Sequence, residues 1–326
     1  MAKNDSDFVS VIKIFFNGIK LYFMNFEQFF KVMAFPVFGQ VIGISLIFFA
    51  SYLFTVYAPT LTTKSPLFDN IPLVFAVLAV LMLPGFFIFC KAFWDYIIAL
   101  ASLNSMASSL LEGSNIDDTG IHSELIKRRT GSYILFLFLL TIIYLVLAIP
   151  ILWGLLAIAF VYLALSFQVF ALEEDKGAFD IIKYSVNYVK FNFIKTAMLL
   201  VLLGITTYWL VPALVSWGFE QSSLIGFFAS VIDNYVKLLP INEINSIISQ
   251  WPFHYSLKSI SVSRHIVLAV VAYIVTAFAL PLRSICCTQL YKEINKKNYA
   301  GKIAAEKLAQ RAKKPKLRKN VEDEEE

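Results

Sequence analysis

The stretch that decides the fold is EEDKGAFDIIKYSVNYVKFNFIKTAMLLVLLGITTYWLVPALVSW, residues 173–217. Its first half predicts an amphipathic helix, because apolar residues recur at spacings of three and four and so share one face. These residues are Phe179, Ile182, Val186, Val189 and Phe193. The other face carries Lys183, Asn187 and Lys190, flanked by Lys176 and Lys195. This pattern is typical of a helix lying in the plane of a membrane interface. The second half, 196–217, is long enough to cross a bilayer.

The composition agrees with a membrane protein. The chain has 326 residues, of which 58% are hydrophobic and 16% charged, and its mean hydropathy is +0.70. Soluble domains are nearer to 45–50% apolar and about 25% charged. The excess lies in long apolar runs, which indicates a polytopic helical membrane protein. The three cysteines, Cys90, Cys286 and Cys287, fall in or beside these runs without metal-ligand spacing, so we expect buried free thiols.

The apolar runs predict an all-α membrane bundle of six transmembrane helices, arranged as three hairpins with cytoplasmic amphipathic or polar segments before them. The expected spans are about 32–56, 71–95, 132–149, 151–172, 196–217 and 265–291. Residues 8–31 form a second amphipathic segment ahead of the first span. We therefore expect a single membrane domain at 1–291 and a charged, disordered cytoplasmic tail at 292–326.

Three features leave alternatives open. The second span either ends near residue 95 or continues as one long tilted helix to Glu112-Gly113, which is the simpler interpretation. Residues 222–240 are apolar but contain Asp233 and Lys237, which would pair one turn apart, so this segment is either re-entrant or lies on the outer surface. In the link 114–131 a helix would begin at Asp117 or Asp118, carry Ile121 and Leu125 on one side, and end in basic residues.

The distribution of basic residues predicts the topology. With six spans and a cytoplasmic N-terminus, most of the 28 Lys and Arg lie in segments that face inward, as the positive-inside rule requires. A seventh span at 222–240 would place the basic tail outside. We therefore expect a multi-pass protein of the plasma (inner) membrane with both termini in the cytoplasm.

The run FALEEDKGAFDIIKYSVNYVKFNFIKTAMLLVLL carries a resemblance. It is similar to a signature of six-span prokaryotic membrane proteins that include the YciC-like proteins and the membrane half of some glycerophosphodiester phosphodiesterases. The matching positions are Glu174, Lys176, Gly177, Ser185 and Asn192-Phe193. The resemblance implies the six-span architecture along nearly the whole chain. It implies no phosphodiesterase activity, because the chain lacks the His-Arg start and the Pro-Glu-Asn motif of the catalytic domain.

The sharpest candidate for a functional site is Lys91 with Asp95, four residues apart on the second span. An ion pair inside a membrane is costly and suggests function, whereas a pair at the inner interface, beside Trp94 and Tyr96, would be structural. No histidine spacing predicts a metal site, and no Gly-rich phosphate loop or catalytic serine motif is present. The sequence thus predicts no catalytic residue, cofactor or metal. The few polar residues inside the spans are Gln40, Thr141, Gln168, Thr206 and Thr207.

Two classes of function follow. The preferred one is a non-enzymatic component that organises lipid or partner proteins, or that takes part in transport. The alternative is a membrane-embedded lipid-modifying enzyme, which would require Lys91, Asp95 and Asp233 to share one cavity. The expected partners are membrane lipids, with anionic headgroups at the cytoplasmic face attracted by basic segments. Protein partners or a second copy of the chain are further candidates, and nucleic acid is not expected.

Overall fold

The structure is a computed structural model that describes residues 7–64, 70–114, 116, 118–250 and 256–296. Within these residues it is helical, and six helices are long and apolar enough to cross a membrane. They are Phe26–Thr60, Pro72–Leu111, Thr130–Leu147, Pro150–Leu172, Phe193–Gln221 and Ser259–Lys296. The predicted all-α membrane bundle is confirmed, and each of the six helices covers one of the expected spans.

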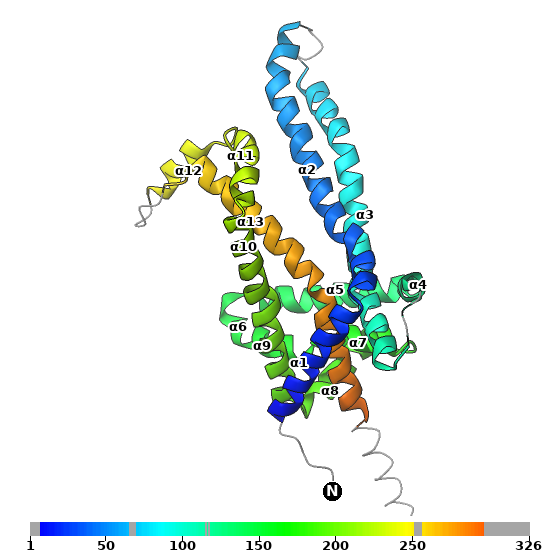
Figure 1. Ribbon diagram of the computed structural model, residues 1–326. Helices are drawn as coiled ribbons and strands as arrows, with labels where there is room; N and C mark the ends of the chain where they lie inside the picture. Colours follow the sequence, from blue (N-terminus) through cyan, green and yellow to red (C-terminus); the bar gives the residue numbers. More distant parts are fainter. Residues whose placement is uncertain (1–6, 65–69, 115, 117, 251–255, 297–326) are drawn as a thin grey trace, which may run out of the picture.

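The first two spans form a long hairpin of α2 (Phe26–Lys64) and α3 (Ile71–Leu111). At about 1.5 Å per residue each is about 60 Å long, twice the thickness of a hydrocarbon core. The second span therefore continues well past residue 95 and ends at Leu111, as the longer of the two interpretations predicted. Figure 1 shows the hairpin projecting from the rest of the molecule.

Small residues hold this hairpin together at one crossing point. A Cβ atom on Gly43 would lie 2.6 Å from the backbone nitrogen of Phe89 and 2.8 Å from the carbonyl oxygen of Gly85. A Cβ atom on Gly85 would lie 2.7 Å from the carbonyl oxygen of Gly43. One turn away, Gly39 faces Ala92 in the same way. Because glycine has no side chain, the two backbones come into direct contact. Close packing of this kind holds helices together in a membrane, where no hydrophobic effect drives their association.

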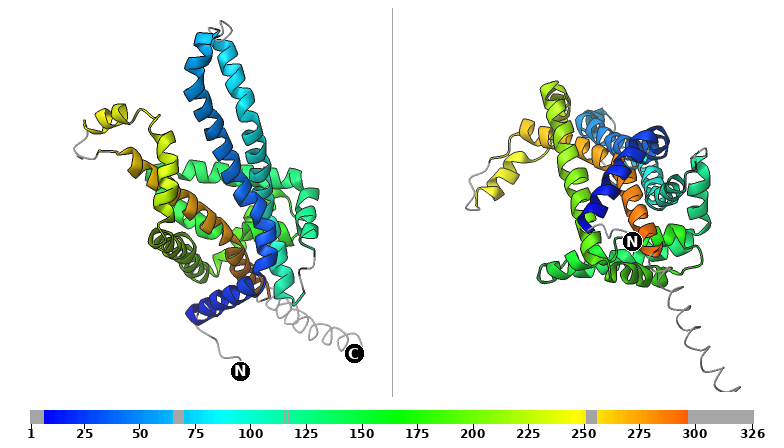
Figure 2. Two further views of the ribbon diagram at one scale, coloured as in Figure 1. Left: turned by 45° about the horizontal axis from the view of Figure 1, so that its top comes forward. Right: turned by 60° about the horizontal axis from the view of Figure 1, so that its bottom comes forward.

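The third span is the continuous helix α5 (Thr130–Leu147), whereas the fourth span is broken. The fourth comprises the 3₁₀ turn η2 (Pro150–Leu152), α6 (Trp153–Tyr162) and α7 (Ser166–Leu172). The predicted join at Pro150 is present, and the indole of Trp153 donates to the carbonyl of Ala148 across it (2.9 Å). The hairpins are not parallel: in Figures 1 and 2, α5 runs across the direction of α2 and α3.

The fifth and sixth spans are also interrupted. The fifth consists of α9 (Phe193–Gly204), the π-helical segment η3 (Ile205–Leu210) and α10 (Val211–Gln221). The sixth consists of α13 (Ser259–Phe278) and the helical residues 280–296, which we call the final helix. Because Tyr291 and Ile294 are buried and the helix continues to Lys296, the predicted boundary at 292 is wrong. Residues 292–296 belong to the bundle, and the rest of the expected disordered tail, 297–326, lies outside the described residues.

The amphipathic segment 8–31 is a separate helix followed by the start of the first span. Helix α1 (Asp7–Met24) packs on the final helix: Asn17 donates to Gln289 (2.9 Å), and Gly18 faces the sulfur of Cys286. Helix α1 ends at Met24, and after a turn at Asn25 the chain enters α2. Figure 2 shows the start of α1 and the end of the final helix on the same side of the molecule, which we call the terminal side.

Helix α8 (Ala178–Lys190) packs on the bundle through a face that periodicity did not identify. Its buried residues are Ala178, Ile181, Ser185 and Val189, whereas Phe179 is 70% exposed. The Ser185 hydroxyl donates to the carbonyl of Tyr162 (2.8 Å). Of the predicted apolar face, Val189 is buried, Ile182, Val186 and Phe193 are partly buried against the core, and Phe179 is turned outward. The polar face is as predicted, because Lys183, Asn187 and Lys190 are exposed.

The segment after the fifth span forms α11 (Leu224–Val236) and α12 (Ile241–Ile248), bent by 92°. This bend fits either a broken span or a re-entrant loop. The expected pair within α11 is present, with Lys237 Nζ 2.7 Å from Asp233 Oδ2. Asp233 lies among the buried residues that pack on α13.

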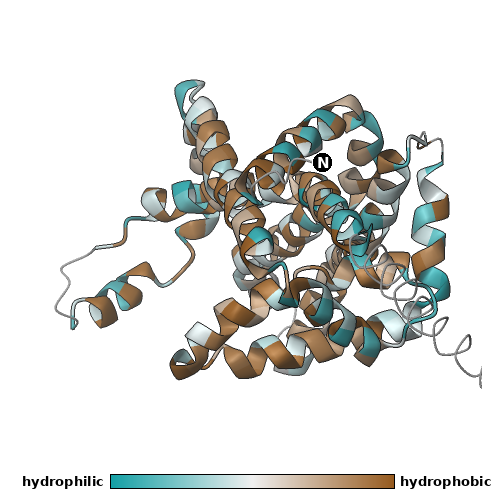
Figure 3. Ribbon diagram, turned by 90° about the horizontal axis from the view of Figure 1, so that it is seen from below, coloured by the Kyte–Doolittle hydropathy of each residue, from teal (hydrophilic) through white to brown (hydrophobic). Residues whose placement is uncertain are grey.

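Large apolar side chains cover the outside of the described bundle. Figure 3 shows how hydrophobic residues are distributed along the helices seen from below. Examples are Phe48, Phe75, Val80 and Trp209, each more than 60% exposed. Water does not tolerate so large an apolar surface, so a bilayer must cover it. The chain is a multi-pass membrane protein.

Candidate functional site

Lys91 and Asp95 form the pair that their spacing predicts. Lys91 Nζ lies 2.5 Å from Asp95 Oδ2 on one face of α3, and the ammonium also lies 5.8 Å from the ring centroid of Phe35. The lysine side chain is 61% exposed and the aspartate side chain 22%. The pair is therefore not enclosed by protein, and the carboxylate is the better shielded of the two groups.

The pair lines a groove between α2, α3 and α4 (Thr119–Arg128), with a volume of about 270 Å³. We call this the lysine groove. Its polar lining residues are Lys31, Lys91, Asp95, Ser102, Thr119, Ser123 and Lys127. Three helices thus contribute one lysine each, and Asp95 is the one carboxylate among the lining residues.

The positive charge of the groove is only partly neutralised. Lys31 pairs with Glu27 at its edge (2.6 Å), and Lys91 pairs with Asp95. Among the described residues, no carboxylate lies within 4.0 Å of the Lys127 ammonium. The groove therefore retains a positive charge in reach of hydroxyl groups, an arrangement suited to a phosphate or carboxylate.

Helix α4 brings Lys127 to the groove, and its start is fixed by a cap. The Asp118 carboxylate accepts from the backbone N–H of Gly120 (2.7 Å), so Asp118 is the cap of the two candidates that the sequence offered. Ile126 is buried against the bundle, whereas Ile121 is 56% exposed, so the side that carries Ile121 is not the packed face. Lys127 lies in the last turn, where a cation is favoured by the helix dipole.

A histidine fastens α4 to α3. His122 Nδ1 lies 2.9 Å from the Ser105 hydroxyl. Burial lowers the pKa of His122 below its ordinary value, against the opposing attraction of Asp118. The neutral imidazole therefore belongs to the folded state. His122 has a structural role here.

The groove holds no catalytic arrangement among its described residues. The hydroxyls of Ser102 and Ser123 donate to the carbonyls of Ala99 (3.4 Å) and Gly120 (2.9 Å), so neither is activated by a base. Asp233, the third residue of the enzyme hypothesis, does not line the groove. It lies on α11, paired with Lys237. The described residues also contain no cluster of three metal-ligating side chains.

A second polar group surrounds a separate cavity of about 240 Å³ between α3, α7, η3 and the final helix. It includes Asn104, Gln168 and Arg283. Of these, the sequence singled out only Gln168. Arg283 directly follows the apolar run 265–282, and an intramembrane cation is a functional signal in its own right. That signal is present in the sequence, although Arg283 is not among the candidate residues named above.

The signature that carries the resemblance has structural roles. Arg129 Nη1 donates to the carbonyl of Phe170 (2.7 Å) and Nη2 to that of Lys176 (3.2 Å), which holds the turn before α8. Asn192 donates to the carbonyl of Tyr188 (3.2 Å) at the end of α8. No family model, curated protein or solved structure matches the chain.

Proposed function

We propose that this protein is a non-enzymatic component of the plasma (inner) membrane that binds anionic lipid headgroups in the lysine groove. Both termini lie in the cytoplasm in this proposal, so the groove faces the inner leaflet. The observation that carries it is the convergence of Lys31, Lys91 and Lys127 from three helices around one carboxylate. Each basic residue near an anionic surface contributes about 1 kcal/mol to binding.

The architecture supports the same proposal. The lysines of α8 are exposed while its phenylalanine faces outward, as in a helix that rests on a membrane surface. The six apolar helices, and the direct passage from α8 to α9, support the proposed relation to the YciC-like proteins. Nothing in the geometry favours the enzyme alternative, because Asp95 and Asp233 belong to different surroundings.

Lipid retention tests the proposal. The protein is reconstituted in nanodiscs of phosphatidylcholine with one-fifth phosphatidylglycerol, extracted into mild detergent, and its bound lipids are counted by native mass spectrometry. We expect enrichment of phosphatidylglycerol and a drop of about fivefold for each of Lys91→Gln and Lys127→Gln, corresponding to about 1 kcal/mol. The matched control is Lys183→Gln on α8. Equal retention by the groove variants and the control would refute the groove as the headgroup site.

A further inference from the structure

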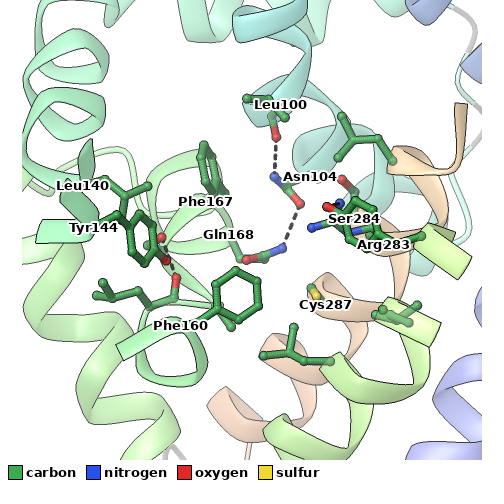
Figure 4. A pocket seen from close by; sticks show the side chains of 18 residues that line it. Leu100, Asn104, Leu140, Tyr144, Phe160, Phe167, Gln168, Arg283, Ser284 and Cys287 are labelled. Atoms are coloured by element: carbon green, nitrogen blue, oxygen red, sulfur yellow. Dashed lines mark hydrogen bonds between the residues drawn. The ribbon is translucent and has the colours of Figure 1, made fainter. Parts of the chain in front are cut away.

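The cavity around Arg283, here called the central cavity, combines apolar walls with a polar end. Figure 4 shows its lining side chains. Leu140, Phe160 and Leu203 are among the wall residues, while Asn104 and Gln168 come together with Arg283 at the polar end. The volume of about 240 Å³ is slightly below the range of about 300–1,000 Å³ for pockets that hold drug-sized molecules.

A chain of hydrogen bonds fixes the orientation of both amides at the polar end. Asn104 Nδ2 donates to the carbonyl of Leu100 (2.8 Å), and Gln168 Nε2 donates to Asn104 Oδ1 (2.9 Å), as the dashed lines in Figure 4 mark. A backbone carbonyl can only accept, so Asn104 must present its amino group to Leu100 and its oxygen to Gln168. Gln168 must then direct its amino group to Asn104, which leaves the other atom of its amide, Oε1, as a fixed acceptor.

This acceptor has no partner among the residues that the structure describes. Gln168 is 4% exposed, and its Oε1 atom is buried without any hydrogen bond. A buried acceptor without a donor costs about 1–3 kcal/mol, and native structures keep few of them. The Gln168 oxygen is therefore poised for a hydrogen-bond donor from outside the chain.

Arg283 supplies a positive charge to the same cavity. Its Nη1 donates to the hydroxyl of Tyr208, and its guanidinium lies 4.9 Å from the centre of the Tyr208 ring. Within the described part of the chain, no carboxylate lies within 4.0 Å of it. A guanidinium has five donors and binds phosphate or carboxylate oxygens in pairs, so most of its capacity is unused.

We infer that the central cavity binds an amphipathic molecule that carries one ionised acidic group and at least one hydrogen-bond donor. The acidic group pairs with Arg283, the donor binds Gln168 Oε1, and the apolar part lies against the wall residues. This site is separate from the lysine groove and does not rest on the proposed function. A lipid headgroup with a hydroxyl and a small free hydroxy-acid or phosphate share this chemistry.

Three lipids of graded headgroup chemistry test the inference on the intact protein. Phosphatidylglycerol has an anionic phosphate and headgroup hydroxyls, phosphatidylmethanol has the same charge without a headgroup donor, and phosphatidylcholine has neither net charge nor donor. We expect retention to fall in that order, with about a fivefold preference for phosphatidylglycerol over phosphatidylmethanol, since one neutral hydrogen bond contributes about 1 kcal/mol. Equal retention of the two anionic lipids by the wild-type protein would overturn the inference for a lipid.

Substitutions in the lining of the central cavity test whether this cavity causes the preference for phosphatidylglycerol. Gln168→Met is expected to abolish the preference between the two anionic lipids, and Arg283→Gln to lower retention of both by at least about tenfold. Ala164→Leu, which adds volume to the cavity lining without touching a polar group, should lower retention as well. Because the lysine groove recognises charge alone, Lys127→Gln should leave the preference for the hydroxyl intact. The experiment therefore distinguishes a failure of headgroup binding in the lysine groove from a failure of ligand binding in the central cavity.

A soluble probe separates the two sources of the ligand. Glycerol 3-phosphate carries the phosphate and hydroxyls without acyl chains, and its binding is measured by titration calorimetry in phosphatidylcholine nanodiscs. Saturable binding that Gln168→Met and Arg283→Gln both abolish identifies a small free anion as the ligand class. Lipid selectivity without binding of the probe identifies a headgroup. If neither the lipids nor the probe show dependence on both residues, the inference is wrong.

Discussion

Lys195 Nζ lies 2.6 Å from Glu293 Oε2, and the lysine side chain is only 4% exposed. The pair joins the start of α9 to the final helix, and Ser10 of α1 approaches the same carboxylate oxygen (3.3 Å). Lys195 was expected to flank an exposed polar face, and Glu293 to lie in a disordered tail. Three segments that are distant in sequence thus meet at one charged contact on the terminal side.

Removing the carboxylate should destabilise the protein. Glu293→Gln leaves the Lys195 ammonium buried without a counter-ion, and breaking a fully buried pair costs about 3–5 kcal/mol. Glu293 is 36% exposed, so we expect a smaller loss, about 2 kcal/mol, in the free energy of unfolding. The measurement is denaturant unfolding in detergent, with Lys183→Gln as the exposed-lysine control. Joint replacement by Lys195→Met and Glu293→Leu should recover most of the loss, and no recovery would contradict the pairing.

The close contact between Gly43 and Gly85 predicts that neither position tolerates a larger side chain. Gly43→Val places methyl groups where the backbone of α3 lies, so the hairpin must separate, and we expect a lower melting temperature in detergent. Gly154, which has no atom within 4 Å of an added Cβ, provides the control Gly154→Ala. Equal melting temperatures for the two variants would show that the close approach of the helices is absent.

The docking of α4 on α3 should depend on pH. Because burial lowers the pKa of His122, the folded state binds fewer protons than the unfolded state, whose histidine titrates near about 6.5. The contribution of the neutral imidazole to stability is fully present above that pH. It is lost as the pH falls through the lower pKa of the folded state. Amide hydrogen exchange in α4 should therefore accelerate below about pH 6.5, relative to α8. In His122→Asn the acceleration should be absent, and its persistence would assign it to another group.

Two tyrosines from different helices share one carboxylate oxygen at the start of the deciding stretch. The hydroxyls of Tyr188 and Tyr291 donate to Glu173 Oε1 at 2.9 and 2.7 Å. Burial, followed by the bond to Glu173, raises the pKa of Tyr188 to about 12. Tyr291→Phe should lower the free energy of unfolding by about 1.5–3 kcal/mol, the range for hydrogen bonds to charged groups. Tyr57→Phe, at a 58% exposed position, should have no measurable effect; similar losses in both would exclude the shared carboxylate.

Hydropathy and local chemistry were sufficient for much of this architecture. The six spans follow from apolar length, a cap at Asp117 or Asp118 from residue type, and the pairs Lys91–Asp95 and Asp233–Lys237 from i, i+4 spacing. Each of these features depends on residues close together in the sequence.

The features that the sequence did not show depend on contacts between distant segments. The face of α8 that packs on the bundle was not predicted. Lipid favours outward apolar side chains, so periodicity does not identify the packed side, where Ser185 lies. Polar composition after Tyr291 suggested a tail, yet Lys292 binds Glu112 at 2.7 Å and the helix continues. The acceptor of Gln168 became visible only once Asn104, 64 residues earlier, was placed beside it.

The order of synthesis gives the final helix a further consequence. Glu293 is 98 residues after Lys195, so at roughly 5–20 residues per second the lysine leaves the ribosome roughly 5–20 s before its partner. During that interval α9 enters the membrane with an unneutralised cation at its base, and α1 lacks the final helix, one of the surfaces on which it packs. Closure of the terminal side therefore waits for residue 293, and a chain interrupted before it leaves the Lys195 ammonium without its counter-ion.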